Sequence, residues 1–169
     1  MTEPAAPRRL GVVVSSTRAA QGRREDLTGP RIAEWGRDHG FDVSGPHVVS
    51  DGPEVGVILR RLVDGGCALV ITTGGTGFTE DDHTPEQTSA LIDRPAPGIA
   101  EAIRAKGLSS TPHAALSRGV AGVSGQTLLV NLAGSTGAVR EGLEVLAGIV
   151  DHALEQLGHP TYPERPLHT

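Results

Sequence analysis

Hydrophobic residues recur along this chain with two different spacings. Short continuous apolar runs predict strands buried on both faces, whereas apolar residues three or four positions apart predict helices that cover those strands. The expected strands are residues 10–14, 41–49, 67–71 and 127–132. Helices are expected to begin near residues 28, 50, 84, 98 and 135. Because strands and helices alternate, the pattern predicts an α/β fold with three layers, in which helices cover both faces of a mostly parallel central sheet.

Local signals refine the ends of these elements. Thr84-Pro85-Glu86-Gln87 matches a capping box with Thr84 as the N-cap residue. The last helix carries a long apolar stripe, which predicts one continuous element with Val139, Leu143, Leu146, Val150, Leu154 and Leu157 on one face. Residues 1–8 and 160–169 are rich in proline and charge without periodicity. We therefore expect loosely held tails on either side of a single domain spanning residues 9–159.

A glycine-rich segment directly follows the strand expected at residues 67–71. It comprises Thr73, Gly74, Gly75, Thr76 and Gly77. At the carboxyl end of a strand in an α/β sheet, where ligands usually bind, glycine lets backbone N–H groups approach an anion closely. The segment matches neither the P-loop nor the dinucleotide fingerprint, because it lacks the required Lys and the third spaced Gly. It therefore predicts a phosphate-binding loop, with a purely structural tight turn as the alternative.

Carboxylates follow this loop at once, as Glu80, Asp81 and Asp82. Carboxylates beside phosphates repel them unless a hard cation such as Mg²⁺ bridges the two groups. Asp82 precedes an expected helix start, and Asp51 occupies the equivalent place after the second strand. The pattern predicts that both lie at one sheet edge as metal ligands. The alternatives are a solvated acidic face for Glu80 and Asp81, and a helix-capping role for Asp51.

A second segment of the same type is Asn131-Leu132-Ala133-Gly134-Ser135, where a strand leads through glycine into a helix. Gly134 and Ser135 are candidates for a second anion pocket at that helix N-terminus. Ordinary N-capping by Ser135 is the alternative.

Composition narrows the class of partner. The chain has 169 residues, a formal net charge of -5 and 2% aromatic residues, so it offers neither a basic face nor a stacking platform for nucleic acid. No apolar run predicts a membrane span or a signal peptide. The single cysteine, Cys67, lies in an apolar run and is expected to be buried. These features favour a cytoplasmic protein and argue against nucleic acid as a partner.

Four motifs in order resemble the MoaB/Mog family of molybdenum cofactor biosynthesis: residues 72–77, Asp82-x-Thr84-Pro85-Glu86, Ser117-Arg118, and Asn131-Leu132-x-Gly134-Ser135. The similarity extends over most of residues 10–155. The resemblance implies a homotrimer that adenylylates molybdopterin with ATP and Mg²⁺ and releases pyrophosphate. It also implies a downstream partner, the enzyme that inserts molybdenum.

The resemblance also implies roles for individual residues. Asp51 and Asp82 match the essential carboxylates, and the glycine loop with Gly134 and Ser135 would surround the ATP phosphates. Thr84, Ser117 and Arg118 would lie near molybdopterin. The chain departs from the family pattern at Thr17, where Asp is common, at Ile99, where an aromatic residue is common, and at Ala133, where Pro is common.

Two other functions fit the same fold. One is a molybdopterin-binding or scaffold module without catalysis, and the other is a nucleotide pyrophosphatase similar to the related domain of competence-damage proteins. Turnover of molybdopterin with ATP, binding without turnover, and hydrolysis of a nucleotide without pterin distinguish the three.

Overall fold

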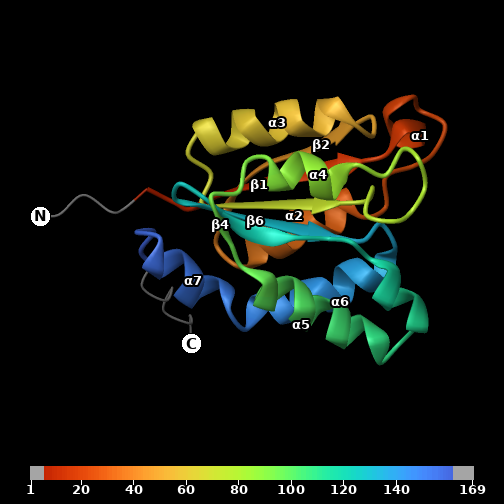
Figure 1. Cartoon of the computed structure of the whole chain (residues 1–169). Helices are drawn as coiled ribbons and strands as arrows, with labels where there is room; N and C mark the ends of the chain where they lie inside the picture. Colours follow the sequence, from red (N-terminus) through yellow and green to blue (C-terminus); the bar gives the residue numbers. More distant parts are fainter. Residues whose placement is uncertain (1–5, 162–169) are drawn as a thin grey trace, which may run out of the picture.

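The computed structural model describes residues 6–161, which form one six-stranded sheet (Figure 1). The strand order is β2-β1-β3-β6-β5-β4. The strands are β1 (Arg9–Ser15), β2 (Asp42–Val49), β3 (Leu69–Thr73), β4 (Arg94–Pro95), β5 (Ala121–Ser124) and β6 (Thr127–Leu132). The first four strands in spatial order are parallel, as predicted, whereas at one edge β5 pairs antiparallel with β6 and β4 pairs antiparallel with β5. These two short strands were not predicted.

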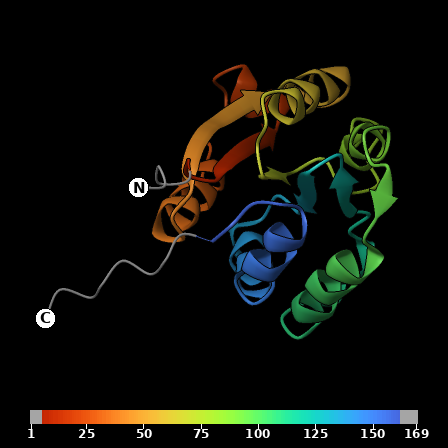
Figure 2. The same ribbon diagram turned by 90° about the vertical axis from the view of Figure 1, so that its left-hand side faces the viewer.

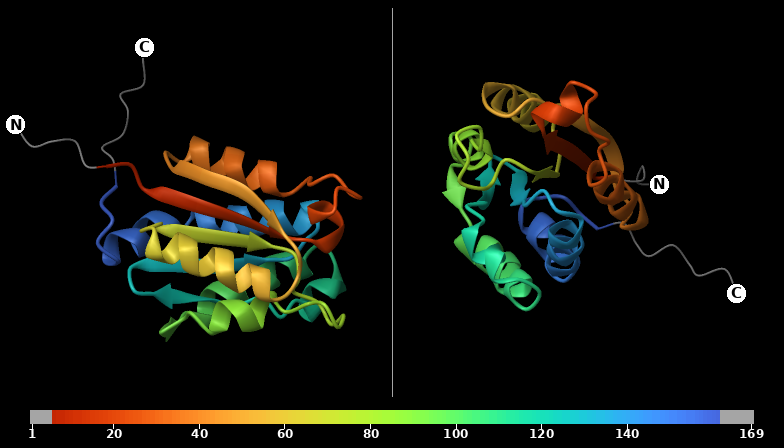
Figure 3. Two further views of the ribbon diagram at one scale, coloured as in Figure 1. Left: turned by 90° about the horizontal axis from the view of Figure 1, so that it is seen from above. Right: turned by 90° about the vertical axis from the view of Figure 1, so that its right-hand side faces the viewer.

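Helices cover both faces of the sheet, which confirms the predicted three layers. They are α1 (Thr17–Ala20), α2 (Gly29–Asp38), α3 (Pro53–Asp64), α4 (Thr84–Ser89), α5 (Pro97–Leu108), the 3-10 helix η1 (Pro112–Leu116), α6 (Thr136–Ala147) and α7 (Val150–Gln156). Figure 2 and the right-hand view of Figure 3 look along the strands. In these views α3 and α4 lie on one face, and α2, α5, α6 and α7 lie on the other.

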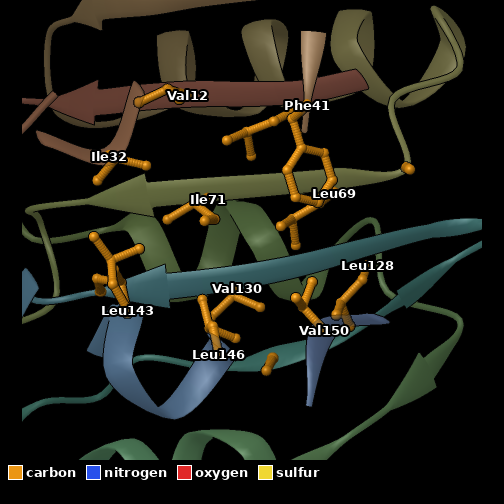
Figure 4. Close-up of a cluster of buried hydrophobic side chains, with 14 of the residues drawn as sticks. Val12, Ile32, Phe41, Leu69, Ile71, Leu128, Val130, Leu143, Leu146 and Val150 are labelled. Atoms are coloured by element: carbon orange, nitrogen blue, oxygen red, sulfur yellow. The ribbon is translucent and has the colours of Figure 1, made fainter. Parts of the chain in front are cut away.

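The core explains why the central strands are continuously apolar. Along β3, Leu69 and Ile71 point into the larger hydrophobic cluster with Leu146 of α6, whereas Val70 joins the smaller cluster with Leu59 of α3. Figure 4 shows the larger cluster between the sheet and the helices. Because successive side chains point to opposite faces and both faces are covered, most positions along such a strand are apolar. The polar exceptions at the end of β3, Thr72 and Thr73, are hydrogen-bonded to Asn131 and to the Ala133 carbonyl.

Two predictions about helices were wrong. The N-cap residue of α4 is His83 rather than Thr84, and no side chain caps this helix. Thr84 is the first helical residue, because its N–H donates to the Gly75 carbonyl (3.1 Å) and this contact draws it against the glycine loop. The predicted last helix is two helices, interrupted at Gly148. Glycine disfavours a helix interior, so the chain turns there while the apolar stripe continues to face the core.

Arg8 corrects the predicted domain boundary. Residues 1–5 and 162–169 of the expected tails lie outside the described residues. Arg8, however, is buried, and it donates to Asp151 Oδ1 and to the His159 carbonyl, each at 2.7 Å. The ordered domain therefore begins before residue 9.

No helix within residues 6–161 is long and apolar enough to cross a membrane. Cys67 is buried as predicted, and burial raises the pKa of its thiol.

Candidate active site

The glycine loop lies at the carboxyl edge of the parallel strands, on the right in Figure 1. Gly74 and Gly75 adopt φ values of 89° and 68°, a region that favours glycine. A Cβ atom on Gly74 would overlap with the Ser15 carbonyl of β1. Glycine is therefore required here both by backbone conformation and by the close approach of a neighbouring strand.

Asp51 is fixed in place by Ser15 at the end of β1 and by Thr17 at the start of α1. Its Oδ1 accepts a hydrogen bond from Ser15 Oγ (2.6 Å), and its Oδ2 accepts from the Thr17 backbone N–H (3.2 Å) and from Thr17 Oγ1 (3.0 Å). The alternative capping role is not observed, because the N-cap residue of α3 is Gly52 and no side chain caps that helix. Asp51 is thus held facing the glycine loop.

Three side-chain oxygens from different elements converge on Gly75. A Cβ atom built on Gly75 would overlap with Thr84 Oγ1, and would lie 2.9 Å from Ser15 Oγ and 3.2 Å from Asp51 Oδ1. Thr84 is fully buried, and its Oγ1 has no hydrogen-bond partner within residues 6–161. Buried hydroxyl groups normally have a partner, so this orphaned oxygen indicates a place where a ligand group or cation would complete the contacts.

These oxygens suit Mg²⁺, which prefers oxygen ligands. No group of three or more His, Cys, Asp or Glu side chains in the described part of the chain could hold a metal ion. Such a cluster is not required, because Mg²⁺ is usually bound by one or two carboxylates together with substrate phosphates. The residues present therefore fit a cation that bridges the protein to a bound phosphate.

Asp82 lies at the other end of the glycine loop. Its Oδ2 accepts a hydrogen bond from the Thr79 N–H (3.0 Å) and lies 2.8 Å from where a Cβ atom on Gly77 would be. Glu80 and Asp81 are exposed. Asp51 and Asp82 are thus both brought to the glycine loop, at Gly75 and Gly77 respectively. That they share one cation remains a prediction.

Arg118 closes the acidic loop onto the glycine loop. Its Nε donates to the Gly77 carbonyl (2.9 Å), its Nη2 donates to the Asp82 carbonyl (2.7 Å), and its Nη1 pairs with Glu86. The hydrogen bond from Arg118 holds the pKa of the Glu86 carboxyl below its usual value. Arg118 therefore orders residues 77–82, and its contact with molybdopterin remains a prediction.

The second loop is tied to the first. Thr73 Oγ1 donates to the Ala133 carbonyl (3.0 Å), and a Cβ atom on Gly134 would lie 3.3 Å from Gly74 Cα. Ser135 Oγ accepts from the Ala138 N–H (3.1 Å), so the N-capping alternative is observed for this residue. Because Ala133 is fixed through its backbone carbonyl, the loop is held in place without the proline that is common in the family.

Asn131 has a structural role. Its Nδ2 donates to Thr72 Oγ1 and to Thr88 Oγ1, each at 2.9 Å, and its Oδ1 accepts from the Val120 N–H (3.1 Å). The side chain is buried, and these bonds join β3, β6 and α4 beneath the loops. Asn131 therefore supports the site without facing a ligand.

Two cavities lie on either side of the joined loops. The smaller, of about 240 Å³, is lined by Ser15, Arg24, Asp26, Thr73, Gly74 and Gly134, among others. The larger, of about 530 Å³, lies between α5, η1 and α6, and its walls include Thr76, Gly77, Ser117, Ala133 and Ser135. Small-molecule pockets usually occupy about 300–1,000 Å³, so the larger cavity alone can take a substantial part of a substrate. The predicted phosphate-binding residues separate the two cavities.

Sequence reasoning missed the contribution of Ser15 and misjudged that of Thr17. Thr17 was noted only as a departure from the family pattern, yet it orients Asp51. The available signal was their position, because both are polar residues that directly follow the apolar run of β1 at the sheet edge where ligands bind. Ile99, the other departure, is half-buried and packs against the larger hydrophobic cluster.

The fold and the site define a class of three-layer α/β domain in which two glycine-containing loops meet at the carboxyl edge of the sheet. Within that class, the chain belongs to the family described as "Probable molybdopterin binding domain", whose model matches residues 11–152. The MoaB/Mog resemblance predicted from the four motifs is therefore confirmed.

Individual relatives support this membership. The chain is 36% identical to gephyrin of Dictyostelium discoideum over 156 residues, which cover 86% of this chain and 22% of gephyrin. It is 36% identical to the molybdopterin adenylyltransferase of Escherichia coli over 140 residues, covering 80% of this chain and 72% of that protein. The structure of the molybdopterin biosynthesis Mog protein from Mycobacterium ulcerans has a TM-score of 0.86 and 51% identity, covering 89% of this chain and 99% of that one. The chain thus spans about a fifth of gephyrin and most of the two smaller proteins.

Proposed function

We propose that this chain catalyses the transfer of the adenylyl group of ATP to molybdopterin, with release of pyrophosphate. The observation that carries the proposal is the pair of joined loops between two cavities, with the oxygens of Asp51, Ser15 and Thr84 converging at Gly75. This arrangement suits a reaction that brings two phosphate-bearing substrates together. Relatives named molybdopterin adenylyltransferase support the same activity.

The chemistry requires positioning more than covalent participation by the protein. The terminal phosphate of molybdopterin attacks the α-phosphorus of ATP, a P–O bond forms, and the bond to pyrophosphate breaks. An ionised phosphate oxygen is already a nucleophile, so no protein base has to remove a proton. Backbone N–H groups of the glycine loop and the N-terminus of α6 are suited to orient the two anions.

Mg²⁺, when bound, would neutralise the negative charge that gathers on the leaving pyrophosphate. Asp51, with Thr84 Oγ1 beside it, would hold the ion at Gly75, and Asp82 would hold it from the Gly77 side. Ser15 and Thr17 keep the Asp51 carboxylate oriented, and Arg118 keeps residues 77–82 in place.

Assembly and cellular context belong to the same proposal. The resemblance to the MoaB/Mog family supports a homotrimer, a cytoplasmic location and passage of the adenylylated product to a molybdenum-inserting enzyme. The proposal covers this domain, since the chain matches only part of larger relatives such as gephyrin.

The direct test is to incubate the purified chain with molybdopterin, ATP and Mg²⁺ and to measure adenylyl-molybdopterin and pyrophosphate. Asp82→Asn keeps the size of the side chain but removes its charge, so the rate is expected to fall roughly 100-fold or more. Asp81→Asn is the matched control, because Asp81 is exposed one residue away, and it should be nearly silent. Pterin binding without product, or nucleotide hydrolysis without pterin, would contradict the proposal in favour of the scaffold or the pyrophosphatase.

A further inference from the structure

The larger cavity contains an acidic side chain for which the proposed reaction has no role. Glu141 of α6 lines this cavity, and its side chain is only 9% exposed. Its Oε1 accepts a hydrogen bond from Ser110 Oγ and lies 3.8 Å from Arg140 Nη2. Its Oε2 makes no hydrogen bond to any residue within 6–161. Only Arg8 Nε and Thr84 Oγ1 are enclosed without a partner among the described residues, so Oε2 is open to the cavity and can accept a hydrogen bond from a ligand there.

The surroundings of Glu141 narrow the chemistry of that ligand. Oε2 lies 3.6 Å from where a Cβ atom on Gly107 would be, and Gly107 itself lines the cavity. Much of the nearby wall is apolar and comprises Ile103, Ala114, Leu116 and Ala138. Apolar walls with a few placed polar groups are typical of small-molecule sites. An acceptor beside such walls suits a planar ring system that presents N–H donors.

We propose that Glu141 is a specificity-determining residue that accepts hydrogen bonds from the 2-amino-4-oxopyrimidine edge of the pterin. That edge presents a ring N–H beside an amino group, so it offers two neighbouring donors to a carboxylate. The corresponding edge of adenine pairs one amino donor with a ring-nitrogen acceptor, which a carboxylate does not complement. This inference rests on the proposed function, and it assigns the pterin to the larger cavity and leaves the smaller one to the nucleotide.

A purely structural role for Glu141 predicts a different result. In that case the carboxylate would serve only to tie α6 to the turn after α5 through Ser110, and its loss would lower stability without changing ligand choice. A second acidic residue on the same helix supplies a comparison. Glu144 forms an exposed ion pair with Lys106 of α5 (3.1 Å), and so it also links α5 to α6, but it does not line the larger cavity.

The test compares two probes by calorimetry with the full chain: a 6-(phosphooxymethyl)pterin and the matching lumazine, in which a carbonyl replaces the 2-amino group. The wild-type chain is expected to bind the pterin at least about tenfold more tightly, since lumazine places an acceptor against the carboxylate. Glu141→Gln should reduce this preference to about threefold or less, because an amide can donate to the new carbonyl. Glu144→Gln should keep the wild-type preference.

Three results would overturn the inference: equal binding of both probes by the wild-type chain, an unchanged preference in Glu141→Gln, or an equal loss of preference in Glu144→Gln. Melting temperatures of both variants show whether folding contributes. Adenylylation of molybdopterin by the wild-type chain is measured separately. If that reaction proceeds while Glu141→Gln keeps its preference, only the role of Glu141 is wrong; if it does not proceed, the proposed function fails.

Discussion

Replacing Asp51 with Asn changes the chemistry at Gly75 with little change in shape. In the wild-type chain Oδ1 accepts from Ser15, and Oδ2 accepts from two donors of Thr17. The Asn side chain can keep these contacts only by directing its amide oxygen at Thr17 and its amino group at Ser15 Oγ, which then accepts. The change replaces charge-assisted hydrogen bonds with neutral ones, so the free energy of unfolding should fall by only about 1 kcal/mol.

That orientation places an amino group where Asp51 Oδ1 stood, 3.2 Å from where a Cβ atom on Gly75 would be. An amino group is a donor and cannot bind a cation. We therefore expect the adenylylation rate to fall at least roughly 100-fold, equivalent to a barrier increase of about 2.7 kcal/mol, whereas the melting temperature should fall by about 2–4 °C.

Single-turnover adenylylation, with the melting temperature measured on the same preparation, separates these two effects. Asp81→Asn serves again as the exposed control. If Asp51→Asn turns over within threefold of the wild-type rate, the assignment of Asp51 as a cation ligand is wrong. A melting temperature lower by 10 °C or more would instead show that the hydrogen bonds to Ser15 and Thr17 mainly hold the fold together.

Three further predictions follow from the same geometry. Calorimetry should show much weaker ATP binding in excess chelator than with Mg²⁺, because nothing then screens the phosphates from Asp51 and Asp82; equal affinity would contradict the bridging cation. Light scattering at micromolar concentration should give the mass of a homotrimer, and a monomer mass would refute it. Gly75→Ala should lower the free energy of unfolding by more than Gly22→Ala does. Both glycines have positive φ, but of the two only Gly75 would place a Cβ atom against other side chains. Equal losses in the two variants would show that the oxygens around Gly75 move aside freely.

Much of the site was readable from the sequence because its signals are local. A glycine run after a buried strand, with carboxylates beyond it, indicates a ligand-binding edge whatever the rest of the chain does. Gly74 and Gly75 do adopt positive φ, and Asp51 and Asp82 do lie beside the glycine loop. The buried parallel strands were equally clear, because burial on both faces makes the central strands mostly apolar.

The tertiary structure decided which groups meet and which local preferences were overridden. Thr84 occupies the N-cap position of a capping-box motif in the sequence. Its contact with Gly75 nevertheless places it inside the helix, with its hydroxyl facing the site. Arg118 looks free to bind phosphate in the sequence, yet backbone carbonyls 36 and 41 positions away hold its guanidinium. Glu141 looks like one acid among many on an exposed helix until the packing of α5 against α6 buries it beside a cavity. These contacts join residues far apart in the chain, so their energies leave no trace in local composition or periodicity, and only the packed fold determines them.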